Sequence, residues 1–190
     1  MVAVIVLAAG FSRRMNGTDK LFLNIKDKPM YEHAMLLAQN LKPDLCIVVT
    51  NNDKIANKAS ECGFFSVKSP FAENGMGNSV SAGVKALDTR ITHAVFLNAD
   101  QPFICPDTVK KLISLSQMYD KIVVPVADNK PTSPCVFPKR FFNALEALNG
   151  EQGGKTIWKQ NKDDVLFENV PQNQMIDVDT NEQYQNLQKN

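Results

Sequence analysis

Short apolar runs alternate with helical patterns through the first 125 residues of this 190-residue chain, and this alternation limits the folds it can adopt. The runs are residues 2–7, 45–50, 94–97 and 122–126, and helical periodicity lies at 30–41, 53–62, 78–87 and 106–118. Strands that are apolar on both faces belong to parallel sheets covered by helices. The pattern therefore predicts a doubly wound α/β fold with a mostly parallel sheet, right-handed crossovers and helices on both faces.

The remaining third of the chain predicts additions to this sheet rather than a second domain. A proline-interrupted strand at 133–138 precedes helices at 140–148 and 153–160. Two more short strands follow, the second ending at Asp177, and a helix closes the chain. Because the sequence contains no repeat, linker or low-complexity segment, we expect residues 1–190 to form a single domain.

Composition argues against several classes of protein. A net charge of +1 gives no broad basic field, so we expect no nucleic-acid or membrane partner. The four cysteines form no C-x-x-C pair, which argues against a zinc site. The apolar N-terminal run is too short for a membrane span and lacks a signal-peptide pattern, and we expect a cytoplasmic location. Residues 1–30 hold five basic and two acidic side chains, a local charge that suits a small anionic ligand.

Three polar clusters follow predicted strands, at residues 10–20, 98–102 and 177–180. Ligands of doubly wound sheets bind beyond the carboxyl ends of the strands. We therefore expect one binding site to draw on all three clusters.

The first cluster has features of a phosphate site. Ala8, Ala9 and Gly10 have little or no side chain, so backbone can approach a ligand closely. Arg14 supplies a planar fork and Lys20 a movable point charge for phosphate oxygens. Two such cations stabilise the charge that develops during phosphoryl transfer. The alternative is a basic surface loop after a buried strand.

Two acidic residues at strand ends are candidate metal ligands. Asp100 precedes Gln101 and Pro102, and a carboxylate in this position suits Mg²⁺, which takes one or two carboxylates together with phosphates and water. The alternative is a turn-forming aspartate before proline. Asp179 has helix capping as its alternative role, but Thr180 with Gln183 fits a capping box and leaves Asp179 for the metal.

Two glycine-rich segments resemble phosphate-binding loops, but each also has a purely structural explanation. Residues 75–79 (GMGNS) open a predicted helix, where backbone N–H groups and Ser79 are able to meet a base or phosphate; a loop with an N-cap is the favoured reading. Residues 150–156 (GEQGGKT) look like a P-loop, but the glycine spacing is one short and no strand precedes them. We predict a helix end that runs into the next helix. The opening loop also does not fit G-x-G-x-x-G.

The ordered set LAAGFSRRM…DK, GMGNSVSAG, NADQP and DVDT resembles the MobA-like nucleotidyltransferases, most closely the molybdenum cofactor cytidylyltransferases of the MocA type. The resemblance implies a Rossmann-like α/β fold of the nucleotide-diphospho-sugar transferase type, which agrees with the strand pattern above. It also implies Mg²⁺-dependent transfer of a nucleoside monophosphate from a nucleoside triphosphate to a phosphorylated acceptor, with release of pyrophosphate.

The resemblance also assigns roles to residues. Arg14, Lys20 and Asp100 would be catalytic, and Asp100 and Asp179 would hold the metal. No side-chain nucleophile is implied, because the acceptor phosphate attacks the α-phosphorus. The implied nucleotide-binding set is Leu7, Ala8, Ala9, Gly10, Arg14, Lys20, Thr50, Ser79 and Asp100.

Departures from the family pattern leave both substrates open. Ala9 favours CTP, whereas Asn16 and the longer spacing to Lys20 resemble the guanylyltransferases. An alanine, Ala99, replaces the usual glycine before the acidic motif. The acceptor-side Gly-His-Pro motif is replaced by Thr-Ser-Pro at Ser133 and its neighbours.

Our first expectation is CTP with molybdopterin as the acceptor. The alternatives are GTP, a sugar- or alditol-phosphate acceptor, or a non-catalytic nucleotide- or pterin-binding protein that delivers cofactor to a molybdoenzyme. A molybdoenzyme or chaperone is a possible protein partner.

Overall fold

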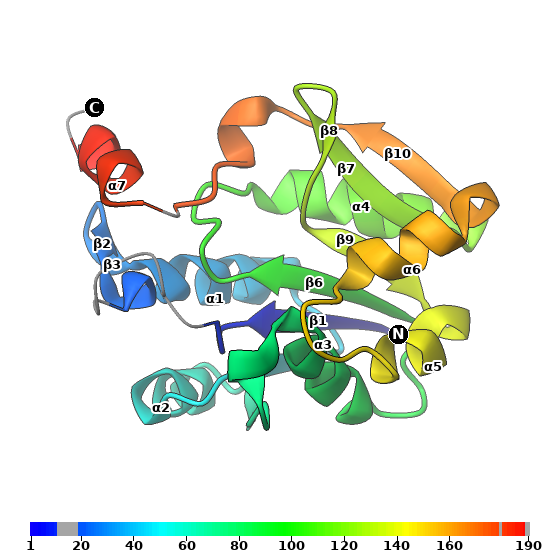
Figure 1. Ribbon diagram of the computed structural model, residues 1–190, viewed down its shortest axis with the longest axis horizontal. Helices are drawn as coiled ribbons and strands as arrows, with labels where there is room; N and C mark the ends of the chain where they lie inside the picture. Colours follow the sequence, from blue (N-terminus) through cyan, green and yellow to red (C-terminus); the bar gives the residue numbers. More distant parts are fainter. Residues whose placement is uncertain (11–18, 179, 189–190) are drawn as a thin grey trace.

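The computed structural model describes residues 1–10, 19–178 and 180–188, and its centre is an eight-stranded sheet with the order β10-β7-β9-β6-β1-β4-β5, with β8 paired to β7 (Figure 1). The strands are β1 (Val2–Leu7), β4 (Leu45–Val49), β5 (Phe65–Val67), β6 (His93–Asn98), β7 (Ile122–Ala127), β8 (Lys130–Pro131), β9 (Cys135–Pro138) and β10 (Val165–Asn169). A separate two-stranded sheet joins β2 (Asn24–Ile25) to β3 (Lys28–Pro29).

The predicted mostly parallel, doubly wound sheet is confirmed. Strand β1 lies between β4 and β6 and is parallel to both, and β4 pairs in parallel with β5. Strand β9 is antiparallel to both β6 and β7 and separates them. The first residue of β9 therefore lies at the same edge of the sheet as the last residue of β6.

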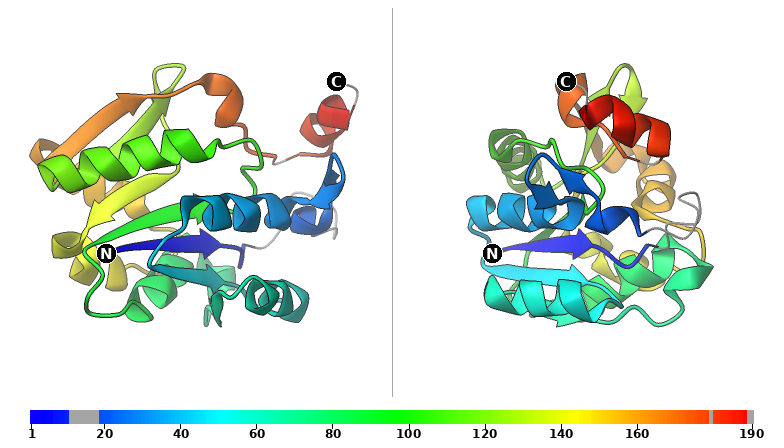
Figure 2. Two further views of the ribbon diagram at one scale, coloured as in Figure 1. Left: turned by 180° about the vertical axis from the view of Figure 1, so that it is seen from behind. Right: turned by 90° about the vertical axis from the view of Figure 1, so that its left-hand side faces the viewer.

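Seven helices, counted over the described residues, accompany the sheet: α1 (Met30–Leu41), α2 (Asp53–Glu61), α3 (Met76–Lys85), α4 (Pro106–Tyr119), α5 (Phe142–Glu146), α6 (Gly154–Gln160) and α7 (Asn181–Gln188). Alternate side chains of β1 belong to two hydrophobic cores, one on each face of the sheet. Val4 and Val6 pack with residues of α1, α2 and α4, whereas Ala3 and Ile5 pack with α3, α5 and α6. Figure 2 (left) shows α1 and α4 on one face, and Figure 1 shows α3, α5 and α6 on the other.

The C-terminal part departs from the prediction in two places. Residues 175–178 form no strand; Met175 and Val178 are buried by packing instead, Val178 beside Ile25 and Met30. The helix predicted at 140–148 is shorter, because a 3-10 turn at Lys139–Phe141 precedes α5. No helix among the described residues is long and apolar enough to cross a membrane.

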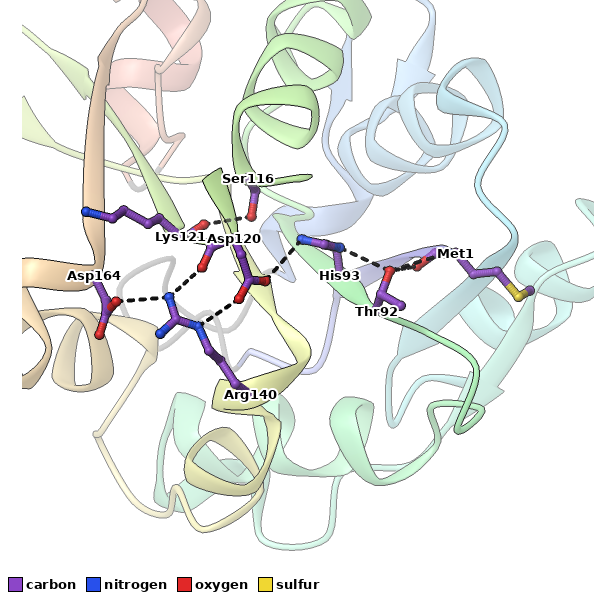
Figure 3. A network of polar contacts seen from close by, with 8 residues as sticks. All are labelled: Met1, Thr92, His93, Ser116, Asp120, Lys121, Arg140 and Asp164. Carbon is purple, nitrogen blue, oxygen red and sulfur yellow. Dashed lines mark hydrogen bonds and ion pairs between the residues drawn. The ribbon is translucent and has the colours of Figure 1, made fainter. Parts of the chain in front are cut away.

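A chain of polar contacts closes the edge of the sheet at which β1 and β6 begin (Figure 3). The Thr92 hydroxyl donates to the Met1 carbonyl at 2.9 Å and lies 3.1 Å from His93 Nδ1. Since that hydroxyl proton is used by Met1, the imidazole Nδ1 is the donor to Thr92. Nε2 of His93 then faces Asp120 Oδ1 at 4.0 Å, buried and without a hydrogen-bond partner among the described residues.

The same aspartate ties three further segments together. Asp120 Oδ2 forms an ion pair with Arg140 Nε at 3.2 Å, and Arg140 Nη2 donates to Asp164 Oδ1 at 2.9 Å. Arg140 also donates to the Asp120 carbonyl. The turn after α4, the 3-10 turn before α5 and the turn before β10 are thus linked at this edge.

We predict that His93 makes the protein less stable as the pH falls. Burial lowers the pKa of His93 below its usual 6.5, despite the opposing charge of Asp120. The unfolded chain therefore binds the proton more readily, and the free energy of unfolding should fall as the pH drops below about 7 and through the folded pKa. Urea unfolding between pH 7.5 and 5.5 should show this slope, and His93→Gln should flatten it. An unchanged slope in the variant would contradict the assignment.

Candidate functional site

The carboxyl ends of the central strands converge as the sequence predicts. Backbone pairing continues one residue past each strand: Ala8 N–H donates to the Val49 carbonyl at 2.8 Å, and Ala99 N–H donates to the Leu7 carbonyl at 3.1 Å. Thr50 N–H likewise donates to the Val67 carbonyl at 2.9 Å. Residues that follow β1, β4 and β6 are therefore held along one edge. Ala8 and Ala9 are buried there, and Gly10 is exposed.

Lys20 and Asp100, which are 80 residues apart in the chain, meet at this edge. Lys20 Nζ lies 2.7 Å from Asp100 Oδ2, and the two side chains are only 16% and 24% exposed. Partial burial strengthens the attraction between them relative to a pair in water. This ion pair is the centre of the candidate site.

A short 3-10 turn, Lys20–Phe22, presents the lysine. Asp19 caps the turn by accepting the Leu21 N–H at 3.1 Å, and the Leu21 side chain is buried in the core. The Phe22 ring packs on Tyr31 of α1 with centroids 5.3 Å apart. Lys20 thus extends from an anchored turn. The sequence reasoning did not assign a role to Asp19, although an aspartate followed by a turn is a recognisable capping signal.

The second oxygen of Asp100 suits a cation. Oδ1 is buried and has no hydrogen-bond partner among the described residues, while Oδ2 is engaged by Lys20. A buried acceptor left without a partner is costly, and a carboxylate oxygen is the ligand that hard cations prefer. The described residues contain no group of three His, Cys, Asp or Glu side chains able to hold a metal by themselves. This arrangement fits an ion that takes one protein carboxylate here and completes its shell with phosphate and water.

Two predicted site residues, Arg14 and Asp179, lie outside the described residues. The chain beside the second one is held at the site edge, because Val178 N–H donates to the Asp100 carbonyl at 3.2 Å. The predicted capping box is confirmed: Thr180 N–H donates to Gln183 Oε1 at 3.0 Å, and Gln183 N–H donates to Thr180 Oγ1 at 3.2 Å. Capping of α7 therefore does not require Asp179.

The residues beyond β4 are bonded to the loop before α3. Asn51 exchanges two hydrogen bonds with the Ser69 backbone, both at 2.9 Å. The buried hydroxyls of Ser69 and Ser79 lie 3.0 Å apart, and Thr50 accepts the Asn52 N–H at 3.1 Å. Ser79 and Thr50 thus lie in one network with protein partners. Asn51 and Ser69 were missed by the sequence reasoning.

The glycine-rich segment before Ser79 packs against another backbone segment. Gly77 N–H donates to the Gly150 carbonyl at 2.9 Å, which satisfies a donor in the first turn of α3. A Cβ at Gly75 would lie 2.3 Å from the Gly150 oxygen, and one at Gly77 would lie 2.7 Å from Asn149 backbone atoms. The glycines therefore allow close packing. As predicted, Gly150 lies between α5 and α6 and is not part of a P-loop.

The family model described as the MobA-like NTP transferase domain matches residues 4–165. The chain is 25% identical over 191 residues to a molybdenum cofactor guanylyltransferase of Shewanella halifaxensis (strain HAW-EB4), covering 98% of this chain and 93% of that protein. It is 28% identical over 194 residues to the purine catabolism protein PucB of Bacillus subtilis (strain 168), covering 95% and 92%.

Solved structures show the same fold. The crystal structure of Rv0371c from Mycobacterium tuberculosis H37Rv superposes with a TM-score of 0.86 at 24% identity, covering 100% of this chain and 97% of that chain. A complex of that protein with manganese gives a TM-score of 0.79 at 23% identity, covering 99% and 98%. This likeness confirms the predicted fold class.

Close packing of the glycine segment predicts a stability effect. Gly77→Ala should lower the free energy of unfolding by about 1–3 kcal/mol, because the new methyl group meets backbone atoms that cannot rotate away. Gly10→Ala is the matched control, since nothing lies within 4 Å of its added Cβ. Thermal melts of the two variants compare these effects. Equal melting temperatures would contradict the packing role.

Proposed function

The chain belongs to the MobA-like NTP transferase family, and we propose that this nucleotidyltransferase transfers a nucleoside monophosphate to a phosphorylated, molybdopterin-type acceptor. An oxygen of the acceptor phosphate attacks the α-phosphorus of a nucleoside triphosphate. The bond between the α-phosphorus and the oxygen bridging to the β-phosphate breaks, and pyrophosphate leaves. The acceptor is already anionic, so the reaction needs no general base.

The Lys20–Asp100 pair is the observation that supports this reaction most directly. It brings a cation and a carboxylate to the edge where β1 and β6 end, and the buried Oδ1 of Asp100 has no hydrogen-bond partner among residues 1–10, 19–178 and 180–188. Lys20 would bind phosphate oxygens and stabilise the charge that grows on the departing pyrophosphate. Asp19 holds the turn from which Lys20 extends. The catalytic contribution of this chain is positioning and charge neutralisation rather than covalent chemistry.

We propose a divalent cation, Mg²⁺ or Mn²⁺, at Asp100 Oδ1, with Asp179 as a second ligand. Such an ion supplies charge neutralisation of the triphosphate. The buried Oδ1 of Asp100, which has no partner within the described part of the chain, fits such an ion, and the manganese complex of Rv0371c supports a divalent ion in this fold. The phosphate role of Arg14 is part of the same proposal.

GTP is our first choice of nucleotide. The curated relatives include several molybdenum cofactor guanylyltransferases, and the spacing from Asn16 to Lys20 resembles that branch. Ala9 remains the feature that favours CTP. A non-catalytic delivery protein is less consistent with the site, because a carrier does not need the partly buried Lys20–Asp100 pair.

Nucleotide preference can be measured by thermal stability. At a hundredfold excess over Kd, a nucleotide stabilises the folded state by about 2.7 kcal/mol, which raises Tm by roughly 5–10 °C for a chain of this size. With Mg²⁺ or Mn²⁺ present, we expect GTP to give the largest shift among GTP, CTP, UTP and ATP. A larger Tm shift with CTP would contradict the choice of GTP and favour a cytidylyltransferase.

Replacing Asp100 tests the reaction itself. Asp100→Asn should reduce metal-dependent pyrophosphate release, in the presence of nucleotide and molybdopterin, by a factor of about 100 or more, because the metal loses its carboxylate. Asp107→Asn is the control, since Asp107 is an exposed residue in the first turn of α4. Full activity of Asp100→Asn would refute the metal assignment. If the wild-type protein releases no pyrophosphate with any nucleotide, the delivery role is favoured.

A further inference from the structure

A third, small hydrophobic core is separate from the two that cover the faces of the sheet. It contains the buried side chains of Ile25, Met30 and Val178, with Phe103 and Tyr184 packed against them. These residues come from β2 and the start of α1, from the segment after β6, and from the C-terminal part of the chain. Figures 1 and 2 show α7 beside β2 and β3, at one end of the molecule. The third core therefore joins three segments that are distant in the sequence.

Two of these segments also carry the charged pair at the centre of the site. The turn with Lys20 precedes β2, and Leu23 connects the two: its N–H donates to the Lys20 carbonyl at 3.1 Å, and its carbonyl accepts the Met30 N–H at 3.0 Å. Asp100 precedes Phe103 by three residues in the segment after β6. The third core thus holds the chain close to both members of the ion pair.

The C-terminal segment is bonded to each of the other two. Val178 N–H donates to the Asp100 carbonyl at 3.2 Å, and the Val178 side chain is fully buried in the third core. The Tyr184 hydroxyl donates to the Asn24 carbonyl at 3.1 Å, across 160 residues of sequence. One end of this segment therefore contacts the site at Asp100, and the other is fastened to the hairpin that follows Lys20.

Local geometry makes Tyr184 an anchor of this segment. Its N–H donates to the Thr180 carbonyl at 3.0 Å, and the capping box of Thr180 with Gln183 fixes the start of α7. The Tyr184 side chain is half-buried, whereas its neighbours Gln183 and Gln185 are exposed. Loss of the ring would therefore free the first turn of α7, and with it the segment that bonds to Asp100.

We propose that Tyr184 is a positioning residue of the site, which acts through Val178 to hold Asp100 in a fixed position relative to Lys20. A cation on Asp100 and phosphate oxygens on Lys20 require these two groups in one geometry. A displacement of about 1 Å in such a group can cost a factor of about 100 in rate. The inference rests on the proposed function, because that function assigns the cation to Asp100.

Tyr184→Ala should change kcat and metal affinity more than nucleotide affinity. We expect kcat for pyrophosphate release to fall by a factor of about 10 or more. Mn²⁺ binding in the presence of nucleotide, followed by electron paramagnetic resonance of the free ion, should weaken about tenfold. KM for the nucleotide at saturating Mn²⁺ should stay within about twofold of the wild-type value, because the network beyond β4 is untouched. Unchanged kcat and Mn²⁺ affinity would overturn the proposal.

Two further tyrosine variants control this measurement. Tyr184→Phe keeps the ring in the third core and loses only the hydrogen bond to Asn24, so its kcat and Mn²⁺ affinity should stay within about threefold of wild type. Tyr119→Ala removes an exposed tyrosine from the end of α4 and should change neither. An equal loss in Tyr119→Ala would mean that the effect is not specific to the third core, and would contradict the proposal.

Hydrogen exchange at the Val178 amide reports the positioning contact without catalysis. Its N–H is bonded to the Asp100 carbonyl, so Tyr184→Ala should speed its exchange by a factor of about 10, and Tyr119→Ala should not. Unchanged exchange in Tyr184→Ala would overturn the path through Val178. Faster exchange with wild-type kcat and Mn²⁺ affinity would leave Tyr184 a structural role only, and would equally overturn the proposal.

A double variant tests whether the third core is the connection. Ile25→Val removes one methyl group from the hairpin side of this core, and Ile25 is almost fully buried. Because Ile25→Val and Tyr184→Ala loosen the same packing, their combined effect on Mn²⁺ affinity should be smaller than the product of the two separate effects. Effects that multiply in full would show that the two residues act independently, which contradicts the proposal.

The same measurements separate this inference from the proposed function. A wild-type protein that binds Mn²⁺ but releases no pyrophosphate would refute the reaction; weaker Mn²⁺ binding in Tyr184→Ala would then still support the positioning role. Pyrophosphate release by the wild type, with the same kcat and Mn²⁺ affinity in Tyr184→Ala, would refute the positioning role and leave the reaction standing. Absence of Mn²⁺ binding in the wild type would overturn both.

Discussion

The parallel pairing of β1 with β4 on one side and β6 on the other is the constraint on which the site depends. Three strands that run in the same direction must end at the same edge, so the segments that follow them meet there. Lys20 and Asp100 come from two of these segments, and Thr50 comes from the third. The ion pair at 2.7 Å is therefore a consequence of sheet topology, since 80 residues of sequence separate its members.

The antiparallel strand β9 adds a second half to this edge. A parallel strand in its place would direct Thr132, Ser133 and Cys135 to the far edge of the sheet, away from Asp100. Its reversed direction brings these residues to the carboxyl end of β6, where Phe96 pairs with Cys135. α5 and α6 then cover the face that β9 extends. Phe137 of this strand and Trp158 of α6 both line a cavity of about 160 Å³ on that face.

The features that could be predicted from the sequence depend on hydrophobic patterning. Apolar runs such as residues 2–7 and 94–97 identify buried strands, and the topology rules for parallel sheets then predict that Lys20 and Asp100 meet. The capping box of Thr180 and Gln183 was predictable because it is local. The prediction of a strand that ends at Asp177 is wrong. Met175 and Val178 are buried by side-chain packing, and their backbone is not paired with a neighbouring strand.

Long-range backbone contacts could not be predicted from the sequence, because the same residue type suits several kinds of neighbour. A glycine permits close approach by a phosphate or by another peptide equally well, so GMGNS was compatible with both. Only the structure shows that Gly75 and Gly77 meet Asn149 and Gly150. The direction of β9 is likewise not encoded in its apolar pattern, because a buried strand looks the same in either orientation.

The contact of Gly77 with Gly150 and the reversed direction of β9 both shape the same edge of the sheet. Gly77 donates to Gly150, and this contact joins the start of α3 to the segment that leads into α6. Met76 of α3 and Trp158 of α6 both line the cavity of about 160 Å³, and Ser79 of α3 belongs to the network beyond β4. α3 therefore contributes to both sides of the edge. A change in its N-terminal turn would therefore disturb both the hydroxyl contact between Ser69 and Ser79 and the cavity wall at Met76.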